Sequence, residues 1–291
     1  FQPRAAVAPP PATLPRRQWW GVAAAGLTGI GAGWWLGRPP APDLTPALRE
    51  FWQPSGSSAL RSVVCLGTPL FLRYRGAFVR LPGQEDFETL AHGELAQALG
   101  RVLQDAEPVA GHEYTGAGEG SGAFLIAQTL ARGGVFPEIR RSHLLSWEEI
   151  KNENVIFLGS AKYIPQLKQL PDQPEFLADR MGVLNPRPKP GEPDVFKGRR
   201  GSDRDLLEHH AVISRIWGPE RRGRLWLIGG SSTGATLAAV EAICSERKLA
   251  EILARVREGK PGLPESFEVV VKAQFRQEVA VSVQYVTHRS R

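Results

Sequence analysis

The segment Gly230-Ser231-Ser232-Thr233-Gly234 matches the GxSxG pattern of a hydrolase nucleophile elbow. It lies between an apolar run typical of a strand, Leu225–Ile228, and a helix predicted over Ala235–Cys244, which is the context that an elbow needs. Ser232 would then be the nucleophile, but the order serine, acid, histidine leaves only His288 as a later base. Hydroxyls at such a turn also suit helix capping and anion binding. We therefore expect no catalytic residue.

Small hydroxyl residues recur wherever a predicted strand ends or a predicted helix begins. The strand Ser62–Leu66 leads into Gly67-Thr68-Pro69, the strand Asn154–Leu158 leads into Gly159-Ser160, and a glycine-rich stretch precedes the helix Ser121–Ala131. Ligands of open α/β sheets bind beyond the carboxyl ends of the strands, and helix N-termini favour negative charge. The sequence therefore predicts a site for a small anionic ligand, with a carboxylate or phosphate, at Thr68, Ser121, Ser160, Ser231, Ser232 and Thr233. The alternative is that these hydroxyls only cap their own helices.

Metal and nucleic-acid binding are not indicated. None of the six histidines stands in an HExxH pattern, and Cys65 and Cys244 form no CxxC pair, so we expect no metal and no other cofactor. Both cysteines have apolar neighbours, which favours two buried thiols over a disulfide. Half of the net charge of +6 belongs to residues 1–43, where four arginines oppose one aspartate. The rest of the chain lacks the dense basic patch of a nucleic-acid-binding domain.

Short apolar strands alternate with helices from residue 62 onward, which predicts an α/β fold with a mainly parallel sheet and flanking helices. The alternating segments Ser266–Arg276 and Val279–His288 predict a C-terminal β-hairpin, although Gln277-Glu278 is not a preferred turn pair. We expect two lobes, residues 62–170 and 209–291. A Pro/Gly/Arg-rich connecting loop, residues 171–208, would join them. Further elements are expected as helices over Phe87–Leu103 and Lys248–Arg257 and as strands over Phe136–Arg140 and Ala211–Trp217. Ser146 is expected to open a short helix, since its spacing to Glu149 is that of a capping box.

Residues 19–37 form an uncharged run with tryptophan pairs at both ends. As a helix, this run would be about 28 Å long, close to the hydrocarbon thickness of a bilayer, and Trp favours the interfaces. Arg16 and Arg17 precede the run and Arg38 follows it, so the positive-inside rule predicts a cytoplasmic N-terminus and residues 44–291 in the periplasm or outside the cell. Residues 1–18 would be a Pro-rich cytoplasmic linker and 38–61 a second linker. A twin-arginine export signal gives the same topology.

One face of the predicted span carries a small residue at every fourth position. Such a stripe lets another helix approach closely, so the predicted partners are the lipid bilayer and a second transmembrane helix, from a second copy or from another membrane subunit. The stripe consists of Gly21, Ala25, Gly29, Gly33 and Gly37.

The order of linker, single span and outer α/β domain resembles the C-terminal portion of ToxR-like membrane-anchored winged-helix regulators. The start, Phe1-Gln2-Pro3, is similar to the exit from the last strand of a winged domain. No winged helix lies within the 291 residues, so the resemblance assigns DNA contacts to none of them. The outer domain also resembles periplasmic solute-binding folds in its order of strands and Gly-rich turns.

Three functions follow from these patterns. The leading one is a non-enzymatic ligand-sensing or interaction domain on a membrane anchor at the inner membrane. The second is an accessory single-span subunit of a membrane complex, and the third is a serine hydrolase that uses Ser232.

Overall fold

The computed structural model describes residues 44–52, 60–74, 77–81, 85–102, 109–171, 173–200 and 206–291. The predicted linker 1–18, the predicted span 19–37 and its stripe of Gly21, Ala25, Gly29, Gly33 and Gly37 lie outside these residues. Among the helices within the described ranges, none combines the length and apolarity that crossing a bilayer requires.

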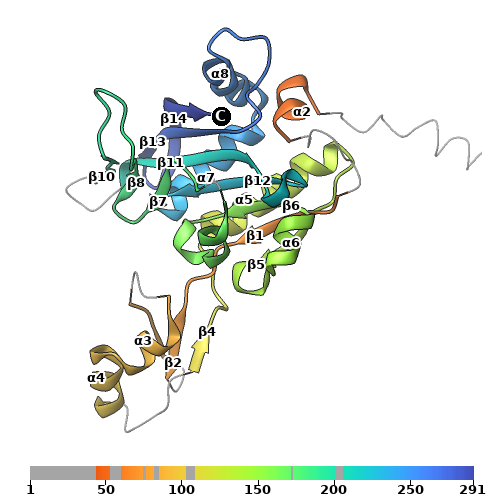
Figure 1. The fold of residues 1–291 in the computed structure, drawn as a ribbon. Coiled ribbons are helices and arrows are strands. Elements are labelled where there is room, and N and C mark those ends of the chain that lie inside the picture. Colours follow the sequence, from red (N-terminus) through yellow and green to blue (C-terminus); the bar gives the residue numbers. More distant parts are fainter. Residues whose placement is uncertain are drawn as a thin grey trace, which may run out of the picture. The chain divides into compact units, whose positions relative to one another are not determined.

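A mixed sheet of eight strands is the centre of the described chain (Figure 1). Seven strands lie side by side and an eighth, β10, pairs with β11. From one edge to the other they are β14 (Val279–Ser290), β13 (Phe267–Arg276), β11 (Leu206–Trp217), β12 (Arg224–Gly230), β6 (Asn154–Leu158), β1 (Ser62–Leu66) and β5 (Glu138–Arg141), with β10 at Arg199–Arg200.

The sheet is only partly parallel, which corrects the prediction of a mainly parallel sheet. The ladders β12–β6, β6–β1 and β1–β5 are parallel, whereas β11 pairs antiparallel with both β12 and β13, and β13 with β14. The physical reason is the short link 218–223 between β11 and β12, because a parallel return needs a crossover of a dozen or more residues.

The two predicted lobes are not separate, so the prediction of a two-lobed layout is wrong. Strands from residues 62–158 and strands from residues 206–290 belong to the same sheet, joined where Leu225–Ile228 of β12 pairs with Val155–Leu158 of β6. Both strands are buried along their whole length and covered on both faces, as parallel strands usually are.

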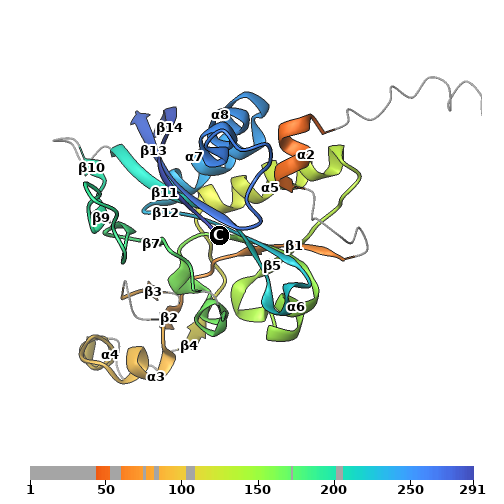
Figure 2. The ribbon, with the colours of Figure 1, turned by 45° about the horizontal axis from the view of Figure 1, so that its top comes forward.

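Helices cover both faces of the sheet (Figure 2), and alternate residues of the central strands pack against the two opposite layers. Val64 and Ile156 face helices on one side, while Val63 and Val155 face α6 and two 3₁₀ helices on the other. The first layer contains α2 (Pro46–Trp52), α5 (Ala117–Arg132), α7 (Thr233–Cys244) and α8 (Glu246–Arg257), and the second contains α6 (Trp147–Asn152), η2 (Ala161–Tyr163) and η3 (Pro165–Gln169). Two more 3₁₀ turns are η1 (Ser142–Leu144) and η4 (Pro219–Arg221).

The segment between β1 and α5, residues 68–115, forms a separate small layer that we call the insert. Its core packs Leu70, Leu72 and Tyr74 against Leu90. The helix predicted over Phe87–Leu103 is interrupted at Gly93 and becomes two helices. The insert contains β2 (Phe71–Tyr74), β3 (Ala77–Val79), α3 (Phe87–His92), α4 (Glu94–Val102) and β4 (Val109–Gly111).

Residues 171–208 contain a small antiparallel sheet where a connecting loop was expected. The sheet packs Phe176, Val183 and Phe196 on Val212 of β11 and Val270 of β13. Burial of these apolar side chains against the main sheet stabilises the ordered structure of the Pro-rich segment. Its strands are β7 (Leu177–Asp179), β8 (Gly182–Leu184) and β9 (Val195–Phe196).

The predicted C-terminal hairpin is confirmed, since β13 and β14 pair antiparallel over ten residue pairs. Its turn uses Gln277 and Glu278 at φ 48° and 66°, both in the left-handed region that a two-residue turn with twisted strands requires. The long ladder compensates for the cost of side chains in that region.

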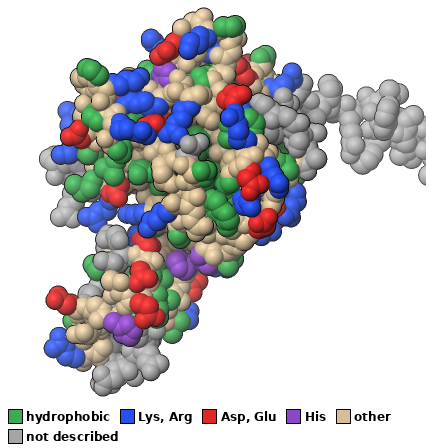
Figure 3. All heavy atoms as spheres, viewed as in Figure 1, with side chains coloured by type: hydrophobic (Ala, Val, Ile, Leu, Met, Phe, Trp, Pro, Cys, Tyr) green, Lys and Arg blue, Asp and Glu red, His purple; other side chains and the backbone are tan. Residues whose placement is uncertain are grey.

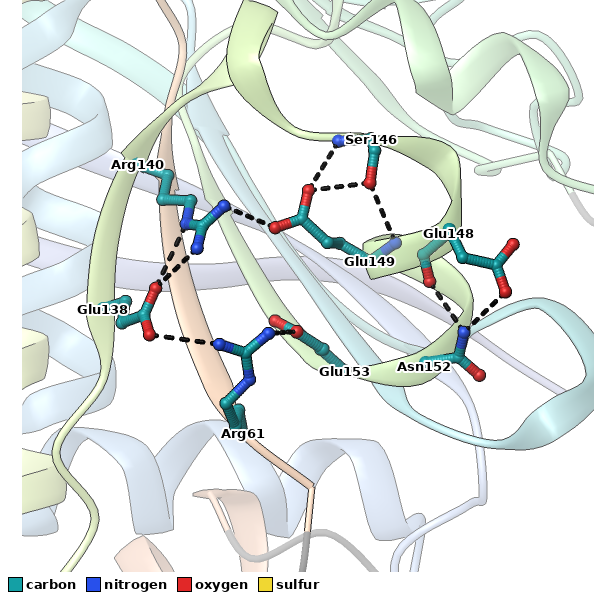
Figure 4. A network of polar contacts seen from close by, with 8 residues as sticks. All are labelled: Arg61, Glu138, Arg140, Ser146, Glu148, Glu149, Asn152 and Glu153. Carbon is teal, nitrogen blue, oxygen red and sulfur yellow. Dashed lines mark hydrogen bonds and ion pairs between the residues drawn. The ribbon is translucent and has the colours of Figure 1, made fainter.

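A polar network joins α6 to β5 and to Arg61, the residue before β1 (Figure 4). Ser146 and Glu149 form the predicted capping box, and Arg140 pairs with Glu149 and with Glu138. Arg61 bridges Glu138 and Glu153. The network therefore holds both ends of α6 against the sheet, through Arg140 at its N-terminus and Arg61 at its C-terminus.

Candidate functional site

A cavity of about 300 Å³ lies at the carboxyl ends of β1, β6 and β12. The chain leaves β1 through the insert and returns as α5 on one face, whereas it leaves β6 toward η2 and η3 on the other face. Neighbouring strands whose connections diverge in this way form the crevice where open α/β sheets bind ligands. The lining residues are Gly67, Pro69, Phe71, Arg80, Tyr114, Thr115, Gly116, Glu119, Ser160, Lys162, Tyr163, Arg180, Gly230, Ser231, Ser232 and Thr233.

Four of the six predicted hydroxyl residues line this cavity: Ser160, Ser231, Ser232 and Thr233. Ser160 follows β6, and the other three are consecutive residues between β12 and the first turn of α7, so two segments about 70 residues apart in the sequence meet at the cavity. Their convergence shows that the strand-end pattern marked a real concavity of the molecule.

Thr68 is not among the lining residues, although Gly67 and Pro69 on either side of it are. Its buried hydroxyl lies 3.2 Å from both Ser142 Oγ and His143 Nδ1. Thr68 therefore fastens the first connection to the insert rather than facing a ligand.

Ser121 is exposed and does not begin its helix, because α5 starts at Ala117 with Gly116 as N-cap. The glycine-rich stretch is helical because α5 packs very closely on α7. A Cβ at Gly118 would lie 2.0 Å from the Thr233 carbonyl oxygen, and one at Gly122 would lie 3.1 Å from the Val240 side chain. Glycine here serves close helix packing, not a flexible phosphate loop.

Glu119 is the buried charge of the site. It lies in the first turn of α5 with 8% of its surface exposed, and it lines the cavity. Thr233 Oγ1 donates to Glu119 Oε2 over 2.5 Å and accepts the N–H of Gly118 over 2.8 Å. A helix N-terminus stabilises negative charge, and this carboxylate stands at the starts of α5 and α7.

The other hydroxyls are held by the backbone. Ser160 donates to the Ala178 carbonyl oxygen over 2.8 Å. Ser232 is the N-cap of α7 and accepts the N–H of Ala235 over 3.2 Å. Capping and cavity lining therefore coexist at Ser232.

The histidine of the site meets Ser231 and not Ser232. His209 Nδ1 lies 2.7 Å from Ser231 Oγ, and the same hydroxyl lies 3.3 Å from the His210 carbonyl oxygen. Both side chains are buried. The serine that contacts a histidine is therefore Ser231, one residue before Ser232, the serine that the GxSxG pattern selects.

Three cations and three aromatic rings complete the lining. Arg80 bonds Glu85 and Tyr163 and stacks over the Tyr163 ring. Burial alone would lower the pKa of Arg80, but these two partners raise it above its ordinary value, so the guanidinium stays charged. Lys162 lies 5.0 Å from the centre of the Tyr163 ring. In Figure 3, Lys and Arg side chains border the hollow where the insert meets the rest of the described chain.

Comparison of the chain with family models, with curated proteins and with solved structures found no match. The resemblance to ToxR-like regulators and to solute-binding folds therefore stays a prediction. The function of the site is therefore inferred from its geometry alone.

Cys65 and Cys244 are both free thiols. Burial, helped by the charge of Glu149, raises the pKa of Cys65 to about 12, and burial raises that of Cys244 to about 11. Protonated thiols are poor nucleophiles and poor metal ligands. Within the described ranges, no group of three or more His, Cys, Asp or Glu side chains is placed to hold a metal ion.

Sequence reasoning missed Glu119, Arg80, Lys162, Arg180 and His209. Only two of them carried a usable signal: Glu119 lies inside the glycine-rich stretch, and Lys162 follows Ser160 by two residues. Arg80 reaches the cavity from the insert, and Arg180 reaches it from the β7–β8 turn, within the segment that was predicted to be a connecting loop.

Proposed function

We propose that residues 44–291 are a sensing domain that binds a small polar ligand in the cavity at the ends of β1, β6 and β12. In this proposal the domain is not an enzyme and is carried outside the cytoplasm by the predicted span at residues 19–37. Ligand binding would be read out through the anchor or through a partner helix packed on it.

One observation carries the proposal: predicted hydroxyls from two segments distant in the sequence, Ser160 and Ser231–Thr233, converge on one cavity at the divergence of β1 and β6. The starts of α5 and α7 both border it, so the positive ends of two helix dipoles lie beside the same volume. Cavities of about 300 Å³ and larger, with few convergent polar groups, are typical of small-molecule sites.

Thermal denaturation of the full chain in mild detergent tests the proposal. The compounds are inorganic phosphate, small carboxylates, amino acids and sugars. A ligand at about a hundred times its Kd stabilises by about 2.7 kcal/mol, which corresponds to a Tm increase of about 5 °C or more.

The binding variant is Arg180→Ala, since Arg180 is exposed, lines the cavity and forms no ion pair within the described residues. Its matched control is Arg132→Ala, at the other end of α5 and also exposed. We expect the Tm increase to persist in the control and to shrink in Arg180→Ala. A wild-type chain that no compound stabilises contradicts the proposal.

The contact of Ser231 with His209 favours one alternative, a serine hydrolase with Ser231 as nucleophile and His209 as base. A fluorophosphonate probe distinguishes the two functions. Labelling that disappears in Ser231→Ala and persists in Ser232→Ala would support the hydrolase, and an unlabelled wild-type chain leaves the sensing domain as the better account.

A further inference from the structure

The cavity contains one negative side chain without a cation. Glu119 is the only acidic residue among those that line it, and within the described residues it takes part in no ion pair. Its recorded partner is the neutral hydroxyl of Thr233. A buried carboxylate is costly unless a positive charge accompanies it, so this wall of the cavity is complementary to a cationic group.

The same cavity also contains positive side chains without an anion. Lys162 and Arg180 line it, and neither forms an ion pair with a carboxylate of the described chain. Arg80 differs, since Glu85 pairs with its guanidinium over 3.1 Å. Lys162 and Arg180 therefore remain available for a carboxylate, which a guanidinium binds in a two-pronged geometry.

A third part of the lining is aromatic. Tyr114 contacts Phe71 and Phe78 edge to face, with ring centres 5.4 and 5.0 Å apart. Phe71, Tyr114 and Tyr163 line the cavity together. This surface suits an apolar or aromatic group that leaves water on binding.

We propose that the ligand is a free amino acid. Its ammonium group pairs with Glu119, its carboxylate pairs with Arg180 and Lys162, and its side chain lies against Phe71 and Tyr114. The inference rests on the proposed function and specifies the ligand class of the same cavity. Neither a simple anion nor a sugar uses both sets of unpaired charges.

The competing account gives Glu119 a structural task only, which is to join the starts of α5 and α7 through Thr233. The two accounts differ in what the charge does. Glu119→Gln keeps an oxygen that accepts the Thr233 hydroxyl and removes the negative charge. A structural role tolerates this change, whereas recognition of an ammonium group does not.

The first experiment needs no variant. The full chain in mild detergent is titrated calorimetrically with each common amino acid. Each amino acid that binds is then compared with the amine that lacks its carboxylate and with the acid that lacks its amino group. We expect binding of the amino acid and at least a ten-fold loss of affinity for both analogues.

The second experiment compares Glu119→Gln and Arg180→Ala with Arg132→Ala, using an amino acid that binds the wild type. Loss of one charge-assisted hydrogen bond weakens binding by about ten- to hundred-fold. We expect this loss in the first two variants and unchanged affinity in Arg132→Ala. If Glu119→Gln does not fold, the analogue series and Arg180→Ala still decide the question.

Three outcomes overturn the inference. Phosphate, a carboxylic acid or a sugar could bind while every amino acid fails, which would leave the proposed function intact and exclude the ligand class. Glu119→Gln could fold and bind an amino acid as tightly as the wild type. Failure of every compound, amino acids included, would remove the proposed function together with this inference.

Discussion

At the scale of single residues, Thr233 has the most demanding position in the site. Its hydroxyl donates to Glu119 and accepts from the Gly118 amide, 114 and 115 residues away in the sequence. A residue that looked like a helix cap therefore links two helices, and the cap itself is Ser232. A double change of Ser232 and Thr233 would remove the cap and the link between helices together, so each residue has to be replaced separately.

We expect Thr233→Val to destabilise the chain by about 1–3 kcal/mol, because the buried Glu119 oxygen and the Gly118 N–H both lose their partner. Thr129→Val is the matched control, since the buried Thr129 hydroxyl donates to the Leu125 carbonyl within its own helix and its bond across to α7 is with the weakly polar Cys244 thiol. Such a bond adds little stability to a helix. Urea unfolding measures both, and equal losses would contradict the linking role of Thr233.

The ring of His112, near the end of the insert, stacks on that of His143 in η1, with centres 4.5 Å apart. His112 Nδ1 lies 3.0 Å from the Thr68 carbonyl oxygen, and His143 contacts the Thr68 hydroxyl. Burial lowers the pKa of His143, and the charges of His112 and Arg141 lower it further, while Glu113 opposes them. Protonation is therefore unfavourable in the folded chain.

The sign of the pH effect follows. A histidine whose pKa is lowered on folding binds its proton more readily when unfolded, so stability is lost as pH falls below about 6.5. His210 and His288, lowered first by burial, act in the same direction. The raised pKa of buried Glu268 acts oppositely, costing stability as pH rises above 4.5.

We expect the Tm of His143→Asn to fall less than that of the wild type when the pH is lowered from about 7.5 to about 5.5, because the variant lacks the histidine whose protonation favours the unfolded chain. The control is His92→Asn, whose side chain on α3 is 77% exposed. It should keep the wild-type pH dependence. A His143→Asn curve parallel to the wild type would show that the stacked pair does not control acid stability.

At the scale of elements, the contact of α5 with α7 decides where the site residues lie. Glycines along α5 let the two helices approach until Gly118 meets the Thr233 carbonyl. Glycine lowers helix stability, so its presence here is compensated by close packing. Gly120, on the same helix, has no atom within 4 Å of a Cβ placed on it.

This difference gives a matched pair of variants. Gly118→Ala forces a methyl group onto backbone atoms and is expected to cost about 1–3 kcal/mol, as overpacking does. Gly120→Ala should be neutral or stabilise by up to about 1 kcal/mol through helix propensity. Thermal unfolding compares them, and a tolerated Gly118→Ala would mean that the two helices are not packed this closely.

At the scale of the whole molecule, the site is built on a single sheet whose strands come from both halves of the described chain. The span that would attach this domain to a membrane lies outside the described residues, and its orientation remains a prediction. The glycine stripe on it is the predicted contact with a second copy or another subunit.

Protease accessibility tests the predicted topology. Protease added to spheroplasts should remove residues 44–291, and inverted vesicles should protect them until detergent is added. Glutamate at both Arg16 and Arg17 removes the positive flank and is expected to reduce the correctly oriented fraction. Protection in spheroplasts together with cleavage in inverted vesicles would place the domain in the cytoplasm.

Local pattern was sufficient for much of the secondary structure. The runs Ser62–Leu66 and Asn154–Leu158 were predicted as strands with the bounds that β1 and β6 have. Ser146 was recognised as part of a capping box from its spacing to Glu149. Continuous apolar runs and caps depend on residues a few positions apart, so their physics is readable along the chain.

The direction of the strands and the composition of the site depend on contacts between distant segments. The six residues between Trp217 and Arg224 limited β11 and β12 to an antiparallel pair, a constraint that was visible in the sequence but was outweighed by the α/β alternation. Nothing local brings Glu119 to Thr233, or Arg80 to the same cavity as Arg180. Hydroxyls at strand ends were predictable because a strand end is a local event. The charges that accompany them were not, because helix packing and the sheet's long-range pairing decide which loops become neighbours.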